Sequence, residues 1–156
     1  MHLSTAGLEL LKKSEGFRDR IYADVVGFHT IGFGHRLNLA EHYPDTITLA
    51  QAESILASDV AIAEAAVTRL VHVPLTQGQF DSLVDFTFNL GAARLASSTL
   101  LRYLNSGRYD EAAWQLLAWD HAGSRELPAL KLRRESEFRL WSPSQHPAPA
   151  AGHQLS

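Results

Sequence analysis

Residues 15–35 read EGFRDRIYADVVGFHTIGFGH, and this stretch divides a short helical start from a long helical remainder. Before it, leucines follow Ser4 or Thr5, either of which can cap a helix, and Gly16 is the type of residue that commonly ends one. Within it, β-branched and aromatic residues lie between glycines, a pattern typical of short strands joined by turns. The sequence therefore predicts one helix followed by a small antiparallel sheet or hairpin.

The remainder of the chain has the punctuation of successive helices. Thr48 and Gln51 form a capping box before residues 49–71, whose apolar residues recur at helical spacing. A second capping box, Thr76 with Gln79, opens the next helix. Shorter helices are predicted over residues 98–105, 110–119 and 128–141. Strands gathered in one segment rather than alternating with helices indicate a mostly helical α+β fold.

These elements predict one domain with two lobes. A chain of 156 residues is long enough to bury roughly 70% of its unfolded surface. We expect a small lobe that holds the only sheet, a linking helix, a larger helical lobe and a disordered tail rich in proline and alanine. Their expected bounds are residues 1–48, 49–71, 72–141 and 142–156.

Composition excludes several kinds of site. There is no cysteine, which rules out disulfides, thiolate metal ligands and a cysteine nucleophile. The 14 basic and 17 acidic residues give a formal net charge of −3, which argues against a nucleic-acid binder built on a basic face. No apolar run is long enough for an export signal, so we expect no stable membrane association. Full protonation of the eight histidines would bring the net charge to about +5.

Two carboxylates in the opening stretch suit acid–base chemistry. Glycoside hydrolysis needs one protonated acid for the leaving oxygen and one ionised carboxylate for water or for developing positive charge. Glu15 falls at a helix end, where the helix dipole and burial favour the protonated form. Asp24 and Asp19 are equally available as the second group. Spacing alone does not choose between them, or exclude that all three are ordinary surface and turn residues.

A longer pattern resembles a known family. A glutamate, eight residues, an aspartate, five residues and a threonine, followed by Ile-Gly-x-Gly-His, resemble the signature of the phage-type lysozymes, the endolysins of glycoside hydrolase family 24. The segments TQGQFDSLVDFTFNLG at 76–91 and LKLRRESEFRLW at 130–141 also resemble this family. In this sequence the signature falls on Glu15, Asp24, Thr30, Ile31, Gly32, Gly34 and His35.

The resemblance implies a lysozyme-like fold and a reaction. Glu15 would be the general acid, while Asp24 and Thr30 would position or activate a water for an inverting hydrolysis. The substrate would be the β-1,4 bond between N-acetylmuramic acid and N-acetylglucosamine in bacterial peptidoglycan, and no metal or cofactor would be needed. The alternatives are a catalytically inactive wall-binding module and a lytic transglycosylase acting on the same substrate.

The resemblance also implies a cellular setting. An endolysin of this kind would be a monomer that accumulates in the host cytoplasm. It would reach the periplasm and the cell wall once a holin permeabilises the membrane, and would lyse the cell at the end of a phage cycle.

Further residues take roles from the same resemblance. Phe88 would form a wall of the saccharide cleft and Gly34 part of its floor, and Arg36 would contact muramyl carboxylate. Polar contacts to the substrate would come from Ser98, Thr99 and Gln115.

Four residues with ionisable side chains also have expected positions or roles. The family pairs the histidine at position 35 with an aspartate on the long helix, here Asp59, which makes His35 a structural brace with a raised pKa rather than a metal ligand. We expect Arg133 and Arg134 on an exposed face of the last helix. Whether an arginine reaches Glu15 stays open at this point.

Overall fold

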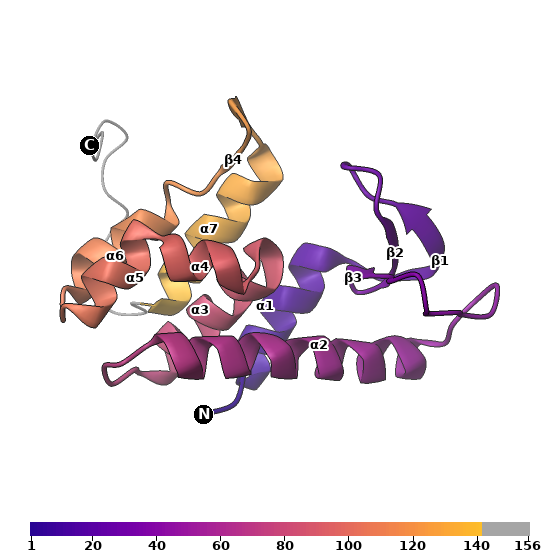
Figure 1. The fold of residues 1–156 in the computed structure, drawn as a ribbon, viewed down its shortest axis with the longest axis horizontal. Coiled ribbons are helices and arrows are strands. Elements are labelled where there is room, and N and C mark those ends of the chain that lie inside the picture. Colours follow the sequence, from indigo (N-terminus) through magenta and orange to yellow (C-terminus); the bar gives the residue numbers. More distant parts are fainter. Residues whose placement is uncertain (142–156) are drawn as a thin grey trace.

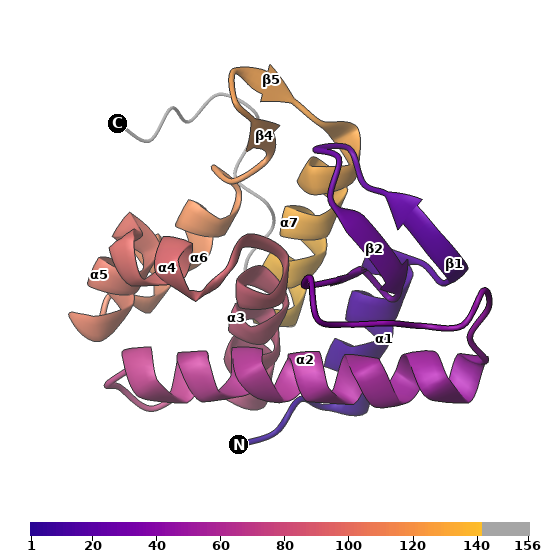
Figure 2. The ribbon, with the colours of Figure 1, turned by 45° about the vertical axis from the view of Figure 1, so that its right-hand side comes forward.

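One long helix, α2 (Leu49–Leu70), runs beneath both parts of the molecule and connects them (Figure 1). The computed structural model describes residues 1–141, so the predicted tail at 142–156 lies outside the described residues. The start of α2 lies under the sheet and its end lies under the helical lobe (Figure 2). The capping box predicted for this helix is present, with Thr48 Oγ1 accepting from the Gln51 backbone N–H.

The small lobe consists of one helix and a three-stranded antiparallel sheet. Helix α1 (Thr5–Glu15) is capped by Ser4 and ends at Gly16, whose φ of 68° favours glycine. Strands β1 (Arg18–Ala23), β2 (His29–Gly32) and β3 (His35–Arg36) lie in the order β1-β2-β3. In this register Thr30 lies opposite Tyr22 on one side and Arg36 on the other.

The helical lobe is built around α3 (Gln77–Leu90), in which every residue from 80 to 87 is buried. Helices α1, α2 and α7 all pack against it. Gly78 is needed at the crossing with α7, because a Cβ there would collide with the Leu140 carbonyl oxygen. The other helices of the lobe are α4 (Ala92–Ser97), α5 (Thr99–Asn105), α6 (Tyr109–Leu116) and α7 (Pro128–Trp141).

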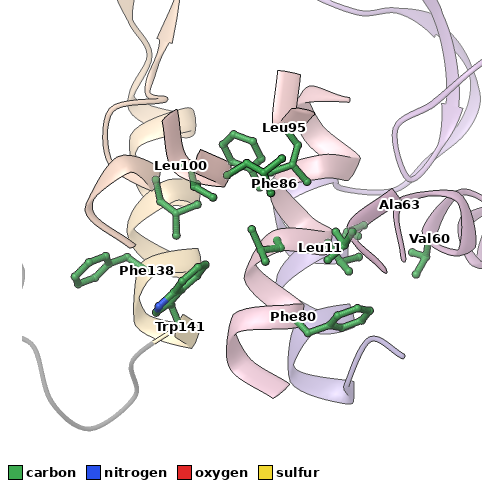
Figure 3. Close-up of a cluster of buried hydrophobic side chains, with 14 of the residues drawn as sticks. Leu11, Val60, Ala63, Phe80, Phe86, Leu95, Leu100, Phe138 and Trp141 are labelled. Carbon is green, nitrogen blue, oxygen red and sulfur yellow. The ribbon is translucent and has the colours of Figure 1, made fainter. Parts of the chain in front are cut away.

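The apolar core extends through both lobes. Figure 3 shows Leu11 of α1 and Phe86 of α3 within this cluster, together with Trp141 of α7. All three side chains are almost fully buried. Because one cluster joins α1 to the helical lobe, the end of α1 is held in a fixed position relative to α3 and α7.

The predicted fold class is confirmed, with one error in the strands. A second antiparallel sheet, β4 (His121–Ala122) with β5 (Arg125–Glu126), turns at Gly123, so the expectation of a single sheet is wrong. Strands of two residues are too short for an alternating pattern to reveal them. Helix α4 was also not predicted. Among helices within residues 1–141, none has both the length and the apolar character needed to cross a bilayer.

Candidate active site

A cleft of about 460 Å³ lies between the small lobe and the end of α3. The three residues predicted to carry the reaction all line it, although they come from α1, from the turn after β1 and from β2. Asp19, the alternative second carboxylate, is exposed on β1 and is not among the lining residues. The polar and aromatic residues that line the cleft are Glu15, Tyr22, Asp24, Thr30, His35, Arg36, Asp59, Thr87, Phe88 and Asn89.

Glu15 is the last residue of α1, and each of its oxygens has a different neighbour. Oε1 accepts a hydrogen bond from Arg133 Nη1 at 2.7 Å. Oε2 lies against Gly34, where a Cβ on any other residue would collide with it. The φ of Gly34 is 71°, which also favours glycine. Gly34 therefore allows the sheet to approach the carboxyl group closely.

Arg133 is held by a second acid in the core. Its side chain is only 6% exposed, and Nε and Nη2 donate to the two carboxylate oxygens of Asp85 at 2.8 and 2.9 Å. Burial alone would raise the pKa of Asp85, but the Arg133 guanidinium outweighs it and lowers that pKa. This two-bond geometry fixes the plane of the guanidinium and aims the remaining Nη1 at Glu15.

Arg134 is also buried and reaches a different residue of the cleft. Its Nη2 donates to Asn89 Oδ1 at 2.9 Å and to Glu137 Oε1 at 2.7 Å. Burial raises the pKa of Glu137 well above its usual range, against the attraction of Arg134. The expectation that Arg133 and Arg134 lie on an exposed face is therefore wrong, because both have acidic partners on or near α3 and α7.

Asp24 occupies the turn between β1 and β2 as an ionised group. Its Oδ1 accepts from the backbone N–H groups of Val26 and Phe28 at 3.0 and 2.9 Å. Its Oδ2 lies 3.2 Å from Arg36 Nε. Desolvation opposes ionisation, but these two backbone bonds, followed by Arg36, lower the pKa of Asp24.

Thr30 is buried on β2 and is one of the residues that line the cleft. Oγ1 donates its proton to the Phe28 carbonyl oxygen at 3.0 Å. A hydroxyl has one donor and two acceptor sites. With the donor engaged, Thr30 is set to accept a hydrogen bond from a molecule in the cleft.

His35 connects the sheet to α2 and to the following loop. Nδ1 lies 2.7 Å from Asp59 Oδ2, and Nε2 lies 2.8 Å from Glu41 Oε1. Burial alone would lower the His35 pKa, but the bonds to Asp59 and Glu41 outweigh it and raise that pKa. Within residues 1–141, no group of acidic residues and histidines is arranged to hold a metal ion.

The expected substrate contacts separate into two groups. Phe88, Gly34 and Arg36 line the cleft, whereas Ser98, Thr99 and Gln115 do not. The Ser98 hydroxyl is buried and is engaged as the cap of α5, where it accepts from the Leu101 backbone N–H. Nothing in the structure supports a sugar contact from this second group.

Sequence reasoning missed several residues in and around the site. Tyr22 lies two residues before Asp24, so the alternation of a strand would have placed both on one face. Asn89 follows Phe88 directly, but a polar residue near a helix end gives no sign of a cleft. Asp85 and Glu41 left no local signal, since Asp85 is distant in sequence from its partner Arg133, and Glu41 lies in an irregular loop after β3.

Comparison with known proteins agrees with this geometry. The sequence matches the phage lysozyme family over residues 12–137. The chain belongs to the phage lysozyme family. The endolysin of Salmonella phage P22 is 38% identical over 144 residues, covering 90% of this chain and 98% of that protein. The endolysin of Acyrthosiphon pisum secondary endosymbiont phage 1 is 40% identical over 145 residues, covering 90% and 98%.

This chain is also similar in fold to solved structures of a muramidase domain and an endolysin. The muramidase domain of SpmX from Asticaccaulis excentricus superposes with a TM-score of 0.81 at 37% identity, covering 91% of this chain and 99% of that one. An endolysin from Escherichia coli O157:H7 phage FAHEc1 gives a TM-score of 0.81 at 33% identity, covering 94% and 97%. The endolysin of Bacillus phage B103 is 40% identical over 143 residues, and this chain spans 54% of the length of that protein.

Membership of the family confirms two expectations. The chain has the lysozyme-like fold, and it is a glycosidase of the lysozyme type, a peptidoglycan-hydrolysing endolysin. The roles of individual residues are a separate matter and depend on the geometry of the cleft.

Proposed function

We propose that this phage lysozyme hydrolyses the β-1,4 bond between N-acetylmuramic acid and N-acetylglucosamine, with Glu15, Asp24 and Thr30 as its catalytic residues. The observation that carries this proposal is the convergence of these three side chains on one cleft from separate elements. A carboxyl group at a helix end faces the same space as an ionised carboxylate and an acceptor hydroxyl. That set is sufficient for glycoside hydrolysis without a metal.

Glu15 acts as the general acid in this proposal. Arg133 donates to Oε1, so a proton on the carboxyl group belongs on Oε2. Oε2 is the oxygen beside Gly34, a cleft-lining residue. The proton is therefore held on the side from which it can reach a glycosidic oxygen.

Asp24 and Thr30 handle the water. Asp24 is ionised, so it can accept a proton from an attacking water or stabilise positive charge on the sugar ring. Thr30 accepts the second proton of that water as a hydrogen bond, because its own proton is directed to Phe28. Attack by water from the face opposite the acid inverts the anomeric carbon.

Two other functions would use the same cleft. An inactive wall-binding module has no need of an acid, an ionised carboxylate and an acceptor hydroxyl placed together. A lytic transglycosylase forms an anhydro sugar without an external water, so a residue pair suited to holding water favours hydrolysis over this reaction.

The products of one digestion separate these functions. Purified peptidoglycan is incubated with the enzyme, and the muropeptides are weighed by mass spectrometry while NMR follows the newly formed anomer. Hydrolysis with inversion gives products that have gained one water molecule and start as the α-anomer. Anhydro products would establish the transglycosylase, an initial β-anomer would contradict the proposed roles of Asp24 and Thr30, and no cleavage would favour the inactive module.

The cellular setting is part of the same proposal. The chain is made in the host cytoplasm, acts as a monomer and depends on a holin to reach the wall. The similarity to phage endolysins supports this setting. Expression in bacteria should cause lysis only when a membrane-permeabilising protein is produced with it, and lysis without one would contradict the proposed dependence.

A further inference from the structure

Asn89 lies at the end of α3, next to Phe88, and its side chain reaches the cleft. Its Oδ1 accepts from Arg134 Nη2 at 2.9 Å. A guanidinium group has only donors, so the amide oxygen must face Arg134. The two ends of the planar amide are thereby distinguished, and Nδ2 points away from the buried arginine.

The group that orients Asn89 is itself fixed. Arg134 is fully buried, and the same Nη2 also donates to Glu137 at 2.7 Å. Its guanidinium lies over the Phe86 ring, 5.1 Å from the ring centroid. A side chain held in this way cannot follow Asn89 into another rotamer, so the orientation of the amide is set before substrate arrives.

The donor end of Asn89 is available. Within residues 1–141, the bond to Arg134 is the only hydrogen bond of the Asn89 side chain, and the residue is only partly buried. An N–H donor on the wall of a cleft needs an acceptor from solvent or from a ligand. Ala63 and Ala66 of α2 line the same cleft and add apolar surface.

A donor together with apolar surface is suited to an acetamido group, which carries a carbonyl oxygen and a methyl group. We propose that Asn89 is a specificity-determining residue whose Nδ2 donates to the acetamido carbonyl of an N-acetylhexosamine unit of the substrate. This inference rests on the proposed function, which puts a chain of such sugars in the cleft. A substrate without the acetyl group leaves the donor unpaired, and losing one such bond corresponds to about a tenfold change in kcat/KM.

The test changes the donor without changing the bond to Arg134. Asn89→Asp keeps the size of the side chain and an oxygen for Arg134, and it replaces the donor by a carboxylate oxygen. A carboxylate suits the ammonium group of a deacetylated sugar. Asn38→Asp is the matched control, because Asn38 Oδ1 also accepts a hydrogen bond, from the Ala40 N–H at 2.8 Å, but lies outside the cleft.

The measurement is kcat/KM on glycan strands before and after chemical N-deacetylation. The wild type and Asn38→Asp should prefer the acetylated strands by about tenfold or more, whereas Asn89→Asp should lose or invert this preference. If Asn89→Asp does not fold by circular dichroism, Asn89→Ser replaces it and should also lose the preference. A variant at position 89 that keeps the wild-type ratio overturns the assignment. A wild type that cleaves neither substrate overturns the proposed function, and this inference with it.

Discussion

Glu15 is defined as much by its neighbours as by its own position. Arg133 contacts one oxygen of its carboxyl group, and Gly34 makes room for the other. The geometry depends on Asp85, which accepts hydrogen bonds from Nε and Nη2 of Arg133. The Nη1 atom of Arg133 is thereby left to donate to Glu15. Asp85 does not line the cleft, so we expect it to act on catalysis only by positioning Arg133.

Asp85→Asn tests this positioning role. An amide has one acceptor oxygen instead of two, and its NH₂ group would oppose a donor of Arg133, so the guanidinium should turn away from Glu15. We expect kcat to fall about 10- to 100-fold with little change in KM, because small misplacements of a reacting group have effects of this size. Steady-state kinetics on soluble peptidoglycan fragments would measure both constants.

Asp81 provides the control for Asp85, four residues earlier on the same helix. It is equally buried, but it accepts hydrogen bonds from the Ser4 backbone N–H and from Gln77, away from the cleft. Asp81→Asn should lower stability and leave kcat of the folded enzyme near the wild-type value. Equal losses of kcat in the two variants would show that Asp85 has only a general structural role.

At the scale of secondary-structure elements, the contact between α3 and α7 places the buried arginines. Gly78 permits this contact, because α7 passes so close that a Cβ at position 78 would collide with the Leu140 carbonyl. Both sides of the collision are backbone or Cβ atoms, so no change of rotamer relieves it. The position of Arg133 relative to Glu15 therefore depends on a helix crossing that requires a glycine.

Gly78→Ala should destabilise the protein. Alanine favours a helix over glycine by about 1 kcal/mol, but overpacking typically costs about 1–3 kcal/mol and here involves backbone that has no alternative position. We expect the free energy of unfolding to fall by about 1–2 kcal/mol and activity to fall with it. Urea denaturation measures the change, and a variant as stable as the wild type would show that α7 can shift without cost.

The contact of β3 with α2 is pH-dependent, because it passes through His35. Since the folded-state pKa of His35 is raised, protonated His35 stabilises the fold, fully below the unfolded value of about 6.5. This stabilisation disappears as the pH rises through the folded-state pKa. His35→Asn should therefore cost on the order of 1 kcal/mol near pH 6 and less near pH 9.

Urea denaturation of His35→Asn at the two pH values measures this difference directly. The exposed His72 gives the control, because comparison with His72→Asn separates the loss of the His35 contacts from a general effect of replacing a histidine. If His35→Asn lowers the free energy of unfolding more in alkaline solution than near pH 6, the result would contradict the stabilising role of protonated His35 between Asp59 and Glu41.

These elements were predictable from sequence to different extents. The capping boxes at Thr48 and Thr76 predicted the starts of α2 and α3, because their signal lies within four consecutive residues. The hairpin β4–β5 has only two-residue strands and gave no periodic signal. The burial of Arg133 depends on Asp85, 48 positions away, which no local pattern reveals.

At the scale of the whole molecule, α2 and α3 hold the small lobe beside the helical lobe (Figure 2), and the cleft lies between the small lobe and the end of α3. Bulk charge acts at the same scale. The formal net charge is −3, although bacterial envelopes are anionic. The eight histidines can reverse the sign in mildly acidic solution.

Adsorption to cell walls should therefore strengthen as the pH falls below about 6.5. Protonated imidazoles add positive charge to the protein, while the wall stays anionic. Binding of the protein to purified walls at fixed ionic strength measures the effect between about pH 7.5 and 5.5. Adsorption that is constant or decreases over this interval would contradict the prediction.

The three residues proposed to be catalytic were easier to single out from sequence than the residues around them. Glu15, Asp24 and Thr30 lie within a single stretch of sixteen positions, so the resemblance to the phage-type lysozymes was sufficient to single them out, and the structure brings them to one cleft. Asn89 and Arg134 come from helices far apart in sequence, and only the packing of α3 on α7 brings them together. Residues that act through a partner were thus visible only in the fold.

The central claim is that Glu15 donates the proton to the leaving oxygen. Glu15→Gln removes that proton with almost no change in shape, and it keeps an oxygen for Arg133. The most direct measurement is kcat/KM of this variant and of the wild type on the same peptidoglycan, with circular dichroism to establish equal folding. We predict a loss of about 10²- to 10⁴-fold, the usual contribution of a general acid. A folded Glu15→Gln enzyme that hydrolyses peptidoglycan within about tenfold of the wild-type rate would contradict the claim.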